Sequence, residues 1–347
     1  MTVSVAPARP ASGADGEGAR EYAREQLERA LAAHAGRFRR IRSVTSQPSA
    51  YGSSFPVDEI DVRFEDGTTM ELIAKLVDRQ AMLPHAHFVK PLFVWDAERE
   101  QAIYEFILAP LDIDSARYFG SYVNGEGVRY LLLERVTGVP LWQCGDFEAW
   151  REAARCLARM HARIGLDTAT HTAAAAHLLK YDRSFYNYWV ERARTFNEGL
   201  HDELVSLTER HEPVIDRLLS EERAFIHGEF YASNVLVDRR ERPPTFLVCP
   251  IDWEMAGLGP LVVDLACLVA GQWTDDERAD IADAYFLELA RLGRPTPRRS
   301  HYLKTLDCCL IHLSIRNLGW SRDWVPPPDR AYDWLGEALR LCDKWQL

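Results

Sequence analysis

The chain has 347 residues, of which 47% are apolar and 27% charged, a composition typical of folded rather than disordered proteins. At roughly 150 residues per domain, this length predicts two domains or lobes. The 41 basic and 52 acidic residues give a formal net charge of −11, which argues against general nucleic-acid binding. No apolar run approaches the roughly 18 residues of a membrane span, so we expect no membrane insertion.

The N-terminal segment and the cysteines bear on location. Residues 1–20 are rich in Ala, Gly and Pro and lack the apolar core of a signal peptide, so we expect a disordered tail. The seven cysteines contain no Cys-x-x-Cys pair, which predicts free, mostly buried thiols in a reducing compartment. We therefore expect a cytoplasmic protein, either a monomer or a homodimer.

The first elements predict a small antiparallel α+β unit. Residues 21–36 have the periodicity of a helix. The alternating stretch 60–64 and the stretch 69–77 predict two strands joined by a turn at Asp66-Gly67. A helix over 95–108 and an apolar strand over 129–136 complete an N-terminal lobe that we place at residues 21–136.

The rest of the chain predicts a mainly helical lobe over residues 137–347. Two short strand-like runs, 234–238 and 245–251, interrupt the helices. The helices are expected at residues 147–164, 185–196, 202–219, 260–271, 277–292, 302–318 and 329–342.

Polar side chains flank these two short strands. His227 and Glu229 lie before the first strand, Asn234 begins it, and Asp252 and Glu254 follow the second. Such positions can converge at one end of a hairpin. Amide and carboxylate oxygens are ligands that Mg²⁺ prefers, and a further carboxylate can accept a proton from a hydroxyl nucleophile.

These motifs resemble the aminoglycoside phosphotransferase and choline kinase family. The resemblance rests on His227-Gly-Glu-Phe-Tyr-Ala-Ser-Asn234, Ile251-Asp-Trp-Glu254 and Gly259-Pro-Leu-Val-Val-Asp-Leu-Ala266, and Leu157-Ala-Arg-Met-His161 is similar to a further run of that family. It implies a bilobal protein-kinase-like α+β fold, with a small antiparallel-sheet lobe, a helical lobe and a site in the cleft.

The resemblance also implies an activity: transfer of phosphate from ATP or GTP, with Mg²⁺, to a hydroxyl of a small molecule. Asn234 and Asp252 would hold the metal, and Glu254 is either a second metal contact or a solvated neighbour. Glu229 would orient or deprotonate the hydroxyl. The resemblance does not identify the acceptor among aminoglycosides, sugars, amino alcohols and other natural products. It also does not decide whether the activity serves antibiotic resistance or biosynthesis.

Two charges on apolar faces of their elements predict an ion pair. Lys75 lies in a strand that is apolar on both faces, and Glu100 lies on an apolar helix face. Each charge is costly unless an opposite one meets it, so a pair explains both. Glu98 and Glu105 are the competing choices for Glu100. By resemblance Lys75 would contact the ATP phosphates and Glu100 would hold it.

Glu229 departs from the family pattern, which has Asp at this position. The extra C–C bond adds about 1.5 Å of reach, while the carboxylate keeps nearly the same intrinsic pKa. Two alternatives follow: a kinase-fold enzyme of secondary metabolism repurposed for non-phosphoryl chemistry, or a non-catalytic pseudokinase.

The remaining contacts of nucleotide and acceptor are expected in loops. Ser53 and Ser54 lie in the Ser-rich stretch 46–55, which either covers the phosphates or is an ordinary turn. Backbone near Glu134 and Val136 would bind the adenine. Candidates for the acceptor pocket are Tyr231, Ser233, Arg316, Trp320, Arg322, Asp323 and Trp324.

Each of these interpretations has a structural competitor. The tryptophans after residue 317 can instead staple a loop to the surface. The acidic run at 275–280 either attracts a cationic acceptor or is a solvated helix start. His227 and Asp264 are expected to have structural roles.

Overall fold

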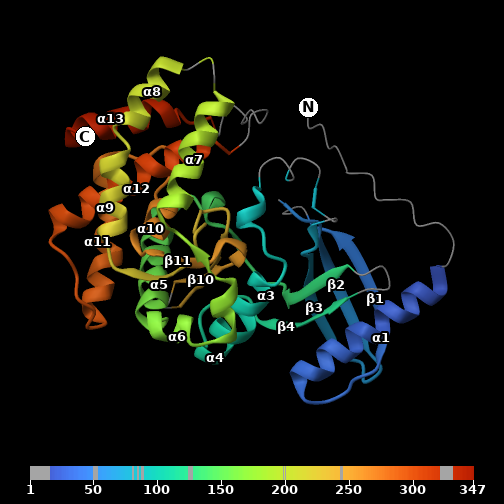
Figure 1. Cartoon of the computed structure of the whole chain (residues 1–347). Helices are drawn as coiled ribbons and strands as arrows, with labels where there is room; N and C mark the ends of the chain where they lie inside the picture. The colour runs from blue at the N-terminus through green and yellow to red at the C-terminus, as the bar shows by residue number, and fades with distance from the viewer. Residues whose placement is uncertain are drawn as a thin grey trace. The chain divides into compact units, whose positions relative to one another are not determined.

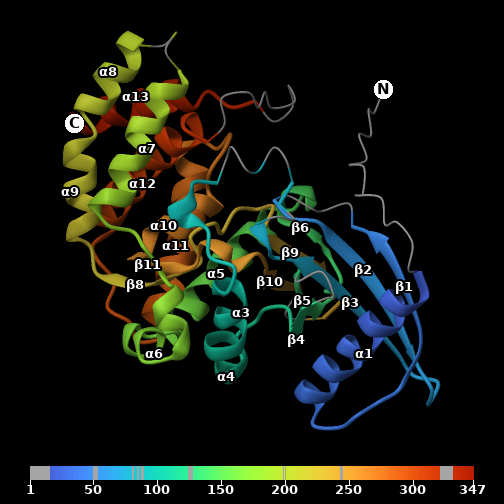
Figure 2. The same cartoon turned by 45° about the vertical axis from the view of Figure 1, so that its right-hand side comes forward.

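The computed structural model is shown in Figures 1 and 2, whose element labels are used below. The described residues are 16–49, 54–79, 82–83, 86, 90–123, 128–197, 199, 201–242, 245–320 and 331–347. They divide into two units, residues up to 83 with 118–135, and residues 84–117 with 136–347.

The first unit is a five-stranded antiparallel sheet with one helix. The strand order is β1-β2-β3-β5-β4. The bounds are β1 Ile41–Pro48, β2 Val57–Phe64, β3 Thr69–Leu76, β4 Tyr118–Val123 and β5 Arg129–Glu134. The turn expected at Asp66-Gly67 joins β2 to β3, and Gly67 has the positive φ (+84°) that such a turn favours.

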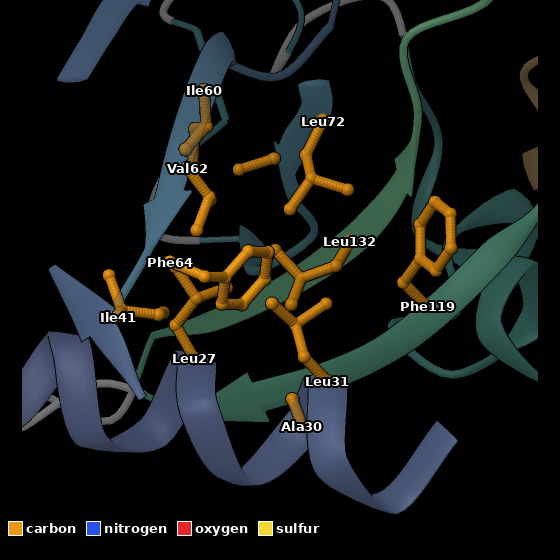
Figure 3. Packing of buried hydrophobic residues seen from close by; sticks show 11 residues of the cluster. Leu27, Ala30, Leu31, Ile41, Ile60, Val62, Phe64, Leu72, Phe119 and Leu132 are labelled. Carbon is orange, nitrogen blue, oxygen red and sulfur yellow. The ribbon is translucent and has the colours of Figure 1, made fainter. Parts of the chain in front are cut away.

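Helix α1 (Gly16–Ala35) packs on the sheet and forms the core of this unit together with it. Leu27, Ala30 and Leu31 point from α1 toward the sheet, where side chains such as Leu72 and Leu132 complete a buried cluster (Figure 3). The helix begins five residues before the expected residue 21, so residues 16–20 of the predicted tail are helical. Residues 1–15 lie outside the described part of the chain.

The second unit is mainly helical. Among its described residues, a 3-10 helix (Leu92–Val94) precedes α3 (Arg99–Ile103), a π-helical stretch (Tyr104–Leu108) and α4 (Ala109–Leu111). The later helices are α5 (Phe147–Arg163), α6 (Leu166–Thr170), α7 (Arg183–Phe196), α8 (His201–Glu209), α9 (Glu212–Ser220), α10 (Val262–Leu268), α11 (Asp275–Arg291), α12 (Arg299–Leu318) and α13 (Trp334–Trp345). Helix α12 contacts α7, α9, α10 and α13 and is buried almost all round.

Two small sheets accompany these helices, in the orders β10-β9-β6 and β7-β11-β8. Their strands are β6 (Val139–Pro140), β7 (Leu179–Lys180), β8 (Arg223–Ile226), β9 (Val235–Arg239), β10 (Phe246–Pro250) and β11 (Gly257–Pro260). The α+β prediction, an antiparallel sheet followed by a mainly helical part, is confirmed.

The structure differs from the predicted domain bounds at residues 84–117. These residues, including the helix expected at 95–108, pack with the second unit rather than the first. Buried Arg99 shows why, because its guanidinium donates to the carbonyls of Val94, His177 and Glu254. The other division, between Arg135 and Val136, lies one residue before the predicted one.

The expected helix over 202–219 is two helices, α8 and α9. The break falls at Arg210 and His211, two residues before Pro213, whose ring cannot continue a hydrogen-bonded helix interior. All seven cysteines are free, and five of them are buried, as expected. In the described part of the chain, no helix is long and apolar enough to cross a membrane.

Two buried histidines meet between α9 and α12. The rings of His211 and His312 stack with centroids 5.4 Å apart, and both side chains are buried. No ring nitrogen of either has a hydrogen-bond partner among the described residues. Burial lowers the pKa of His211 to about 4, and burial, His211 and Arg316 lower that of His312 well below its usual value. The fold therefore holds both rings neutral.

We expect this pair to make the fold acid-sensitive. The unfolded chain binds more protons once the pH falls below about 6.5, so stability is lost from there down to about pH 4. His211 alone should lower the free energy of unfolding by about 2 kcal/mol between pH 7 and pH 5. Urea unfolding of His211→Phe at the two pH values should show a smaller drop than the same substitution at exposed His171. Equal drops would contradict this account.

Candidate active site

Two loops of the second unit are fastened together at both ends. Residues 227–234 connect β8 to β9, and residues 251–256 connect β10 to β11. Ile226 of β8 pairs with Gly257 of β11, and Val235 of β9 pairs with Pro250 of β10. Between these pairs the Ile251 N–H donates to the Asn234 carbonyl at 2.9 Å. The convergence expected from the sequence is thus present.

The Asp264 carboxylate, from α10, binds the backbone of the first loop, residues 227–234. It accepts the backbone N–H groups of His227 and Gly228, both at 2.7 Å, and lies 3.0 Å from Nε2 of His161. Gly228 has a φ of +82°, and a Cβ there would lie 2.1 Å from the Tyr181 hydroxyl. The expected structural role of Asp264 is therefore to fix the backbone of the loop.

Asp264→Asn should destabilise the protein by about 2 kcal/mol. The amide would turn a donor toward one of the two backbone N–H groups, leaving a buried donor unsatisfied. Urea unfolding checks this value against Asp276→Asn, the same change at an exposed position of α11. Matching unfolding free energies for the two variants would refute the role assigned to Asp264.

His227 orients the same loop. Its Nε2 lies 3.0 Å from the Ile251 carbonyl, so this nitrogen carries the proton. Its Nδ1 then accepts the Glu229 N–H at 3.3 Å. The ring also packs on Trp253, with centroids 4.4 Å apart. Both ring nitrogens are thus used in holding the two loops together, as the structural interpretation expects.

Asn234 and Asp252 have the properties of metal ligands. Nδ2 of Asn234 donates to the Glu229 carbonyl at 3.0 Å, and Oδ1 accepts the Ser233 hydroxyl at 3.4 Å, which leaves Oδ1 a second lone pair for another ligand. Asp252 has a left-handed backbone (φ +67°, ψ 66°), a conformation that costs a non-glycine residue about 1–3 kcal/mol and clusters at functional sites. One amide and one carboxylate oxygen fit Mg²⁺, which also takes water and phosphate oxygens.

Glu229 is buried and paired with Arg316. The guanidinium of Arg316, from the end of α12, forms an ion pair with Oε1 of Glu229 and donates to the Gly228 carbonyl at 3.4 Å. The two residues are only 7% and 4% exposed. Burial raises the pKa of Glu229, and the charges of Arg316 and Lys90 oppose that rise. Arg316 is therefore the main charge that opposes the rise in the pKa of this carboxylate.

Arg316 is itself held in place by aromatic rings. Its guanidinium lies 5.5 Å from the ring centroid of Trp189 and 5.4 Å from that of Trp320, and the two indoles stack. The structure places Arg316 against Glu229 and the ring of Trp320 near the Arg316 guanidinium. That either residue belongs to the acceptor pocket stays a prediction.

Glu254 forms an ion pair with the buried Lys90. Its role as a second metal ligand stays a prediction. Sequence reasoning missed Lys90, which lies 164 positions away in the chain. Arg316 had a detectable signal, since it is a charge in a helix that is otherwise almost entirely apolar from residue 308 to 315.

The residues expected around the nucleotide are divided between the units. Lys75 is buried on β3, opposite Val57 of β2 and Leu131 of β5, and Glu134 is exposed at the end of β5. Ser54 accepts the Leu83 N–H through its carbonyl at 2.9 Å, and Ser53 lies outside the described residues.

Glu100 and Val136 belong to the second unit. Glu100 is buried, whereas Glu98 and Glu105 are exposed, which favours Glu100 among the three. Its carboxylate accepts the Trp253 N–H at 3.3 Å, next to Asp252. The Lys75–Glu100 pair stays a prediction.

An open groove of about 500 Å³ borders the first loop, with Tyr231 in its lining. Ser233 is exposed next to Asn234 and is not among the lining residues. Arg322, Asp323 and Trp324, expected at the acceptor pocket, lie outside the described residues.

An antiparallel sheet unit, a helical unit and paired loops carrying Asn234 and Asp252 define the class of kinase-like phosphotransferases. The model of the phosphotransferase enzyme family (APH) matches residues 62–301, more than half of the chain, so the chain belongs to this family.

Solved structures show the same fold. A microcompartment-associated aminopropanol kinase is 14% identical with a TM-score of 0.58, and the match covers 86% of this chain and 90% of that one. A protein of Ralstonia eutropha JMP134, provisionally described as an aminoglycoside phosphotransferase, is 16% identical with a TM-score of 0.53 and coverages of 91% and 94%. No sequence among the curated proteins matches this chain.

Proposed function

We propose that this protein transfers the γ-phosphoryl group of ATP or GTP, with Mg²⁺, to a hydroxyl of a small molecule. The observation that supports the proposal is that Asn234 and Asp252 lie on neighbouring loops. The Ile251 N–H, next to Asp252, donates to the Asn234 carbonyl, and the Asn234 side chain donates to the Glu229 carbonyl. The acceptor oxygen forms a bond to the γ-phosphorus, the bond from that phosphorus to the bridging oxygen breaks, and the hydroxyl proton leaves. The products are a phosphate monoester and the nucleoside diphosphate.

Oδ1 of Asn234 and the carboxylate of Asp252 would hold the metal. When bound, Mg²⁺ neutralises charge on the phosphate oxygens as it develops. The chain's contribution at this point is rigidity: Asn234 is anchored through Nδ2, and Asp252 is held in a strained backbone between β10 and β11. Groups that are fixed in position before the reaction contribute most of the rate enhancement when the transition state is loose.

Glu229 would orient the acceptor hydroxyl and take its proton. The Arg316 guanidinium pairs with this carboxylate, and the bond from the Gly228 N–H to Asp264 fixes the backbone from which Glu229 extends. Lys75, held by Glu100, would brace the phosphates. Ser53, Ser54, Glu134 and Val136 would surround the rest of the nucleotide.

Calorimetric titration with ATP, with and without Mg²⁺, tests the proposal first. Binding that requires Mg²⁺, followed by acceptor-dependent ADP formation, is the expected result. An absence of binding at millimolar nucleotide would overturn it.

One observation favours a second candidate, a kinase-fold enzyme that no longer transfers phosphate. The ion pair with Arg316 occupies the Glu229 carboxylate that would otherwise face an acceptor. This candidate requires that no acceptor provokes ATP consumption. The same titration and ADP assay therefore decide between the two functions.

A further inference from the structure

The turn that carries Asp252 is bound from outside along its backbone. Asp252 has a left-handed conformation, and strain of this kind persists only where the surrounding structure fixes it. Before Asp252, the Ile251 carbonyl lies 3.0 Å from Nε2 of His227. Further along the turn, the Met255 carbonyl accepts the Tyr181 hydroxyl at 2.9 Å. The contacts made between these two points therefore bear most directly on the conformation that follows Asp252.

Two adjacent residues of α3 make those contacts. The Glu100 carboxylate accepts the Trp253 N–H at 3.3 Å, and Nη1 of Arg99 donates to the Glu254 carbonyl at 2.7 Å. Trp253 and Glu254 are the first and second residues after Asp252. One helix thus binds a backbone donor and a backbone acceptor directly after the expected metal ligand, which restrains the rotation of the intervening peptide planes.

Arg99 does more than fill space in the core. Its side chain is 4% exposed, and its other two acceptors are the carbonyls of Val94 and His177. Burial lowers the pKa of this guanidinium, and an apolar side chain could pack in the same place without the cost of burying a charge. What the guanidinium adds is a planar array of donors, which joins the Glu254 carbonyl to two other segments of the chain.

A second cation binds the side chain of the same residue. Lys90 is 4% exposed and forms an ion pair with the Glu254 carboxylate. Arg99 and Lys90 therefore bind the main chain and the side chain of Glu254, two positions after Asp252. The short segment 90–100 thus restrains this turn at several points.

We propose that Arg99 is a positioning residue for the metal site and orients Asp252 through the Glu254 carbonyl. This inference rests on the proposed function. The metal ligands themselves are unchanged when Arg99 is replaced, so the expected defect is a misplaced carboxylate rather than a missing one. Residues that orient metal ligands typically contribute about 10–100-fold to metal affinity or activity.

The test compares Arg99→Met with Arg163→Met. Met retains the unbranched apolar part of the side chain but has no donors. Arg163 also donates to a backbone carbonyl, that of Asp112 at 3.0 Å, and so binds residues 84–117 without reaching the turn. In calorimetric titrations at fixed ATP, the Mg²⁺ concentration for half-maximal binding should rise roughly tenfold or more in Arg99→Met. It should stay at the wild-type value in Arg163→Met.

Amide hydrogen exchange gives a readout that needs neither metal nor nucleotide. In Arg99→Met the amides of residues 251–256 should exchange about tenfold faster, while those of β8 keep their wild-type rates. Arg99→Lys retains a buried cation and should show a smaller change in both measurements, which keeps the test informative if Arg99→Met does not fold. Wild-type Mg²⁺ dependence in either folded Arg99 variant, or an equal change in Arg163→Met, would overturn the inference.

The proposed function fails in a different way. If the wild type binds no ATP with or without Mg²⁺, phosphoryl transfer is ruled out, and selective exchange at 251–256 would show that Arg99 still restrains the turn. If the wild type binds ATP with Mg²⁺ and Arg99→Met does so equally well, the positioning role fails while the proposed function stands.

Discussion

Asp252→Asn is expected to lower kcat by about a thousandfold or more while leaving the fold intact. The substitution keeps the shape of the side chain but removes the negative charge that the metal requires, and losing about 4 kcal/mol of transition-state stabilisation has this effect. Asn is the informative replacement because Asp252 has a φ of +67°. Asn and Asp tolerate this left-handed region, whereas Ala would add backbone strain and confuse a catalytic loss with an unfolded loop.

Two measurements separate the metal role from a structural one. Acceptor-dependent ADP formation should fall in Asp252→Asn, and the Mg²⁺ dependence of ATP binding should disappear. Asp238→Asn makes the same chemical change on β9 and should leave both unchanged. Full turnover in Asp252→Asn would remove this residue from the metal site.

The loops of the site could be predicted because short sequence motifs identify them. His227, Asn234 and Asp252 lie in short motifs at the ends of two apolar strands, and strand pairing then determines where the motifs meet. The positive φ of Asp252 is different, since nothing in the residue types requires it.

The partners of these residues depend on contacts across long stretches of chain. Arg316 is 87 positions from Glu229, and Lys90 is 164 positions from Glu254. Helix periodicity indicates that both Arg316 and its neighbours are buried, but it does not say which carboxylate meets the guanidinium. Only the tertiary packing determines which carboxylate pairs with Arg316.

The short elements escaped prediction for a related reason. Strands β6, β7, β8 and β11 have two to four residues each, too few to establish an alternating pattern. The long helices α5, α11 and α12 were predictable because each carries several turns of apolar periodicity. Each functional loop joins one of these short strands to a predicted one, β8 to β9 and β10 to β11, so the sequence indicated only one of the two strands that hold each loop.

Glu229→Asp is expected to lower activity, although it keeps the carboxylate. In this chain the longer side chain reaches the Arg316 guanidinium, and shortening it by about 1.5 Å removes the ion pair. A misplacement of about 1 Å can cost on the order of a hundredfold in rate. A faster Glu229→Asp enzyme would show that Arg316 does not position the carboxylate.

The pH profile of kcat shows whether Arg316 positions Glu229 or only supports the fold. Burial raises the pKa of Glu229, so the acid limb of the profile should already lie above the range of an ordinary glutamate. Arg316→Met removes the charge that opposes this rise and should move the limb further up, lowering kcat at pH 7 by roughly 10²–10³-fold. Arg316→Lys retains a cation and should recover part of both effects, with its fold checked by urea unfolding. An unshifted acid limb in folded Arg316→Met would mean that Glu229 does not act as the base, and the proposed chemistry would then rest on Asn234 and Asp252 alone.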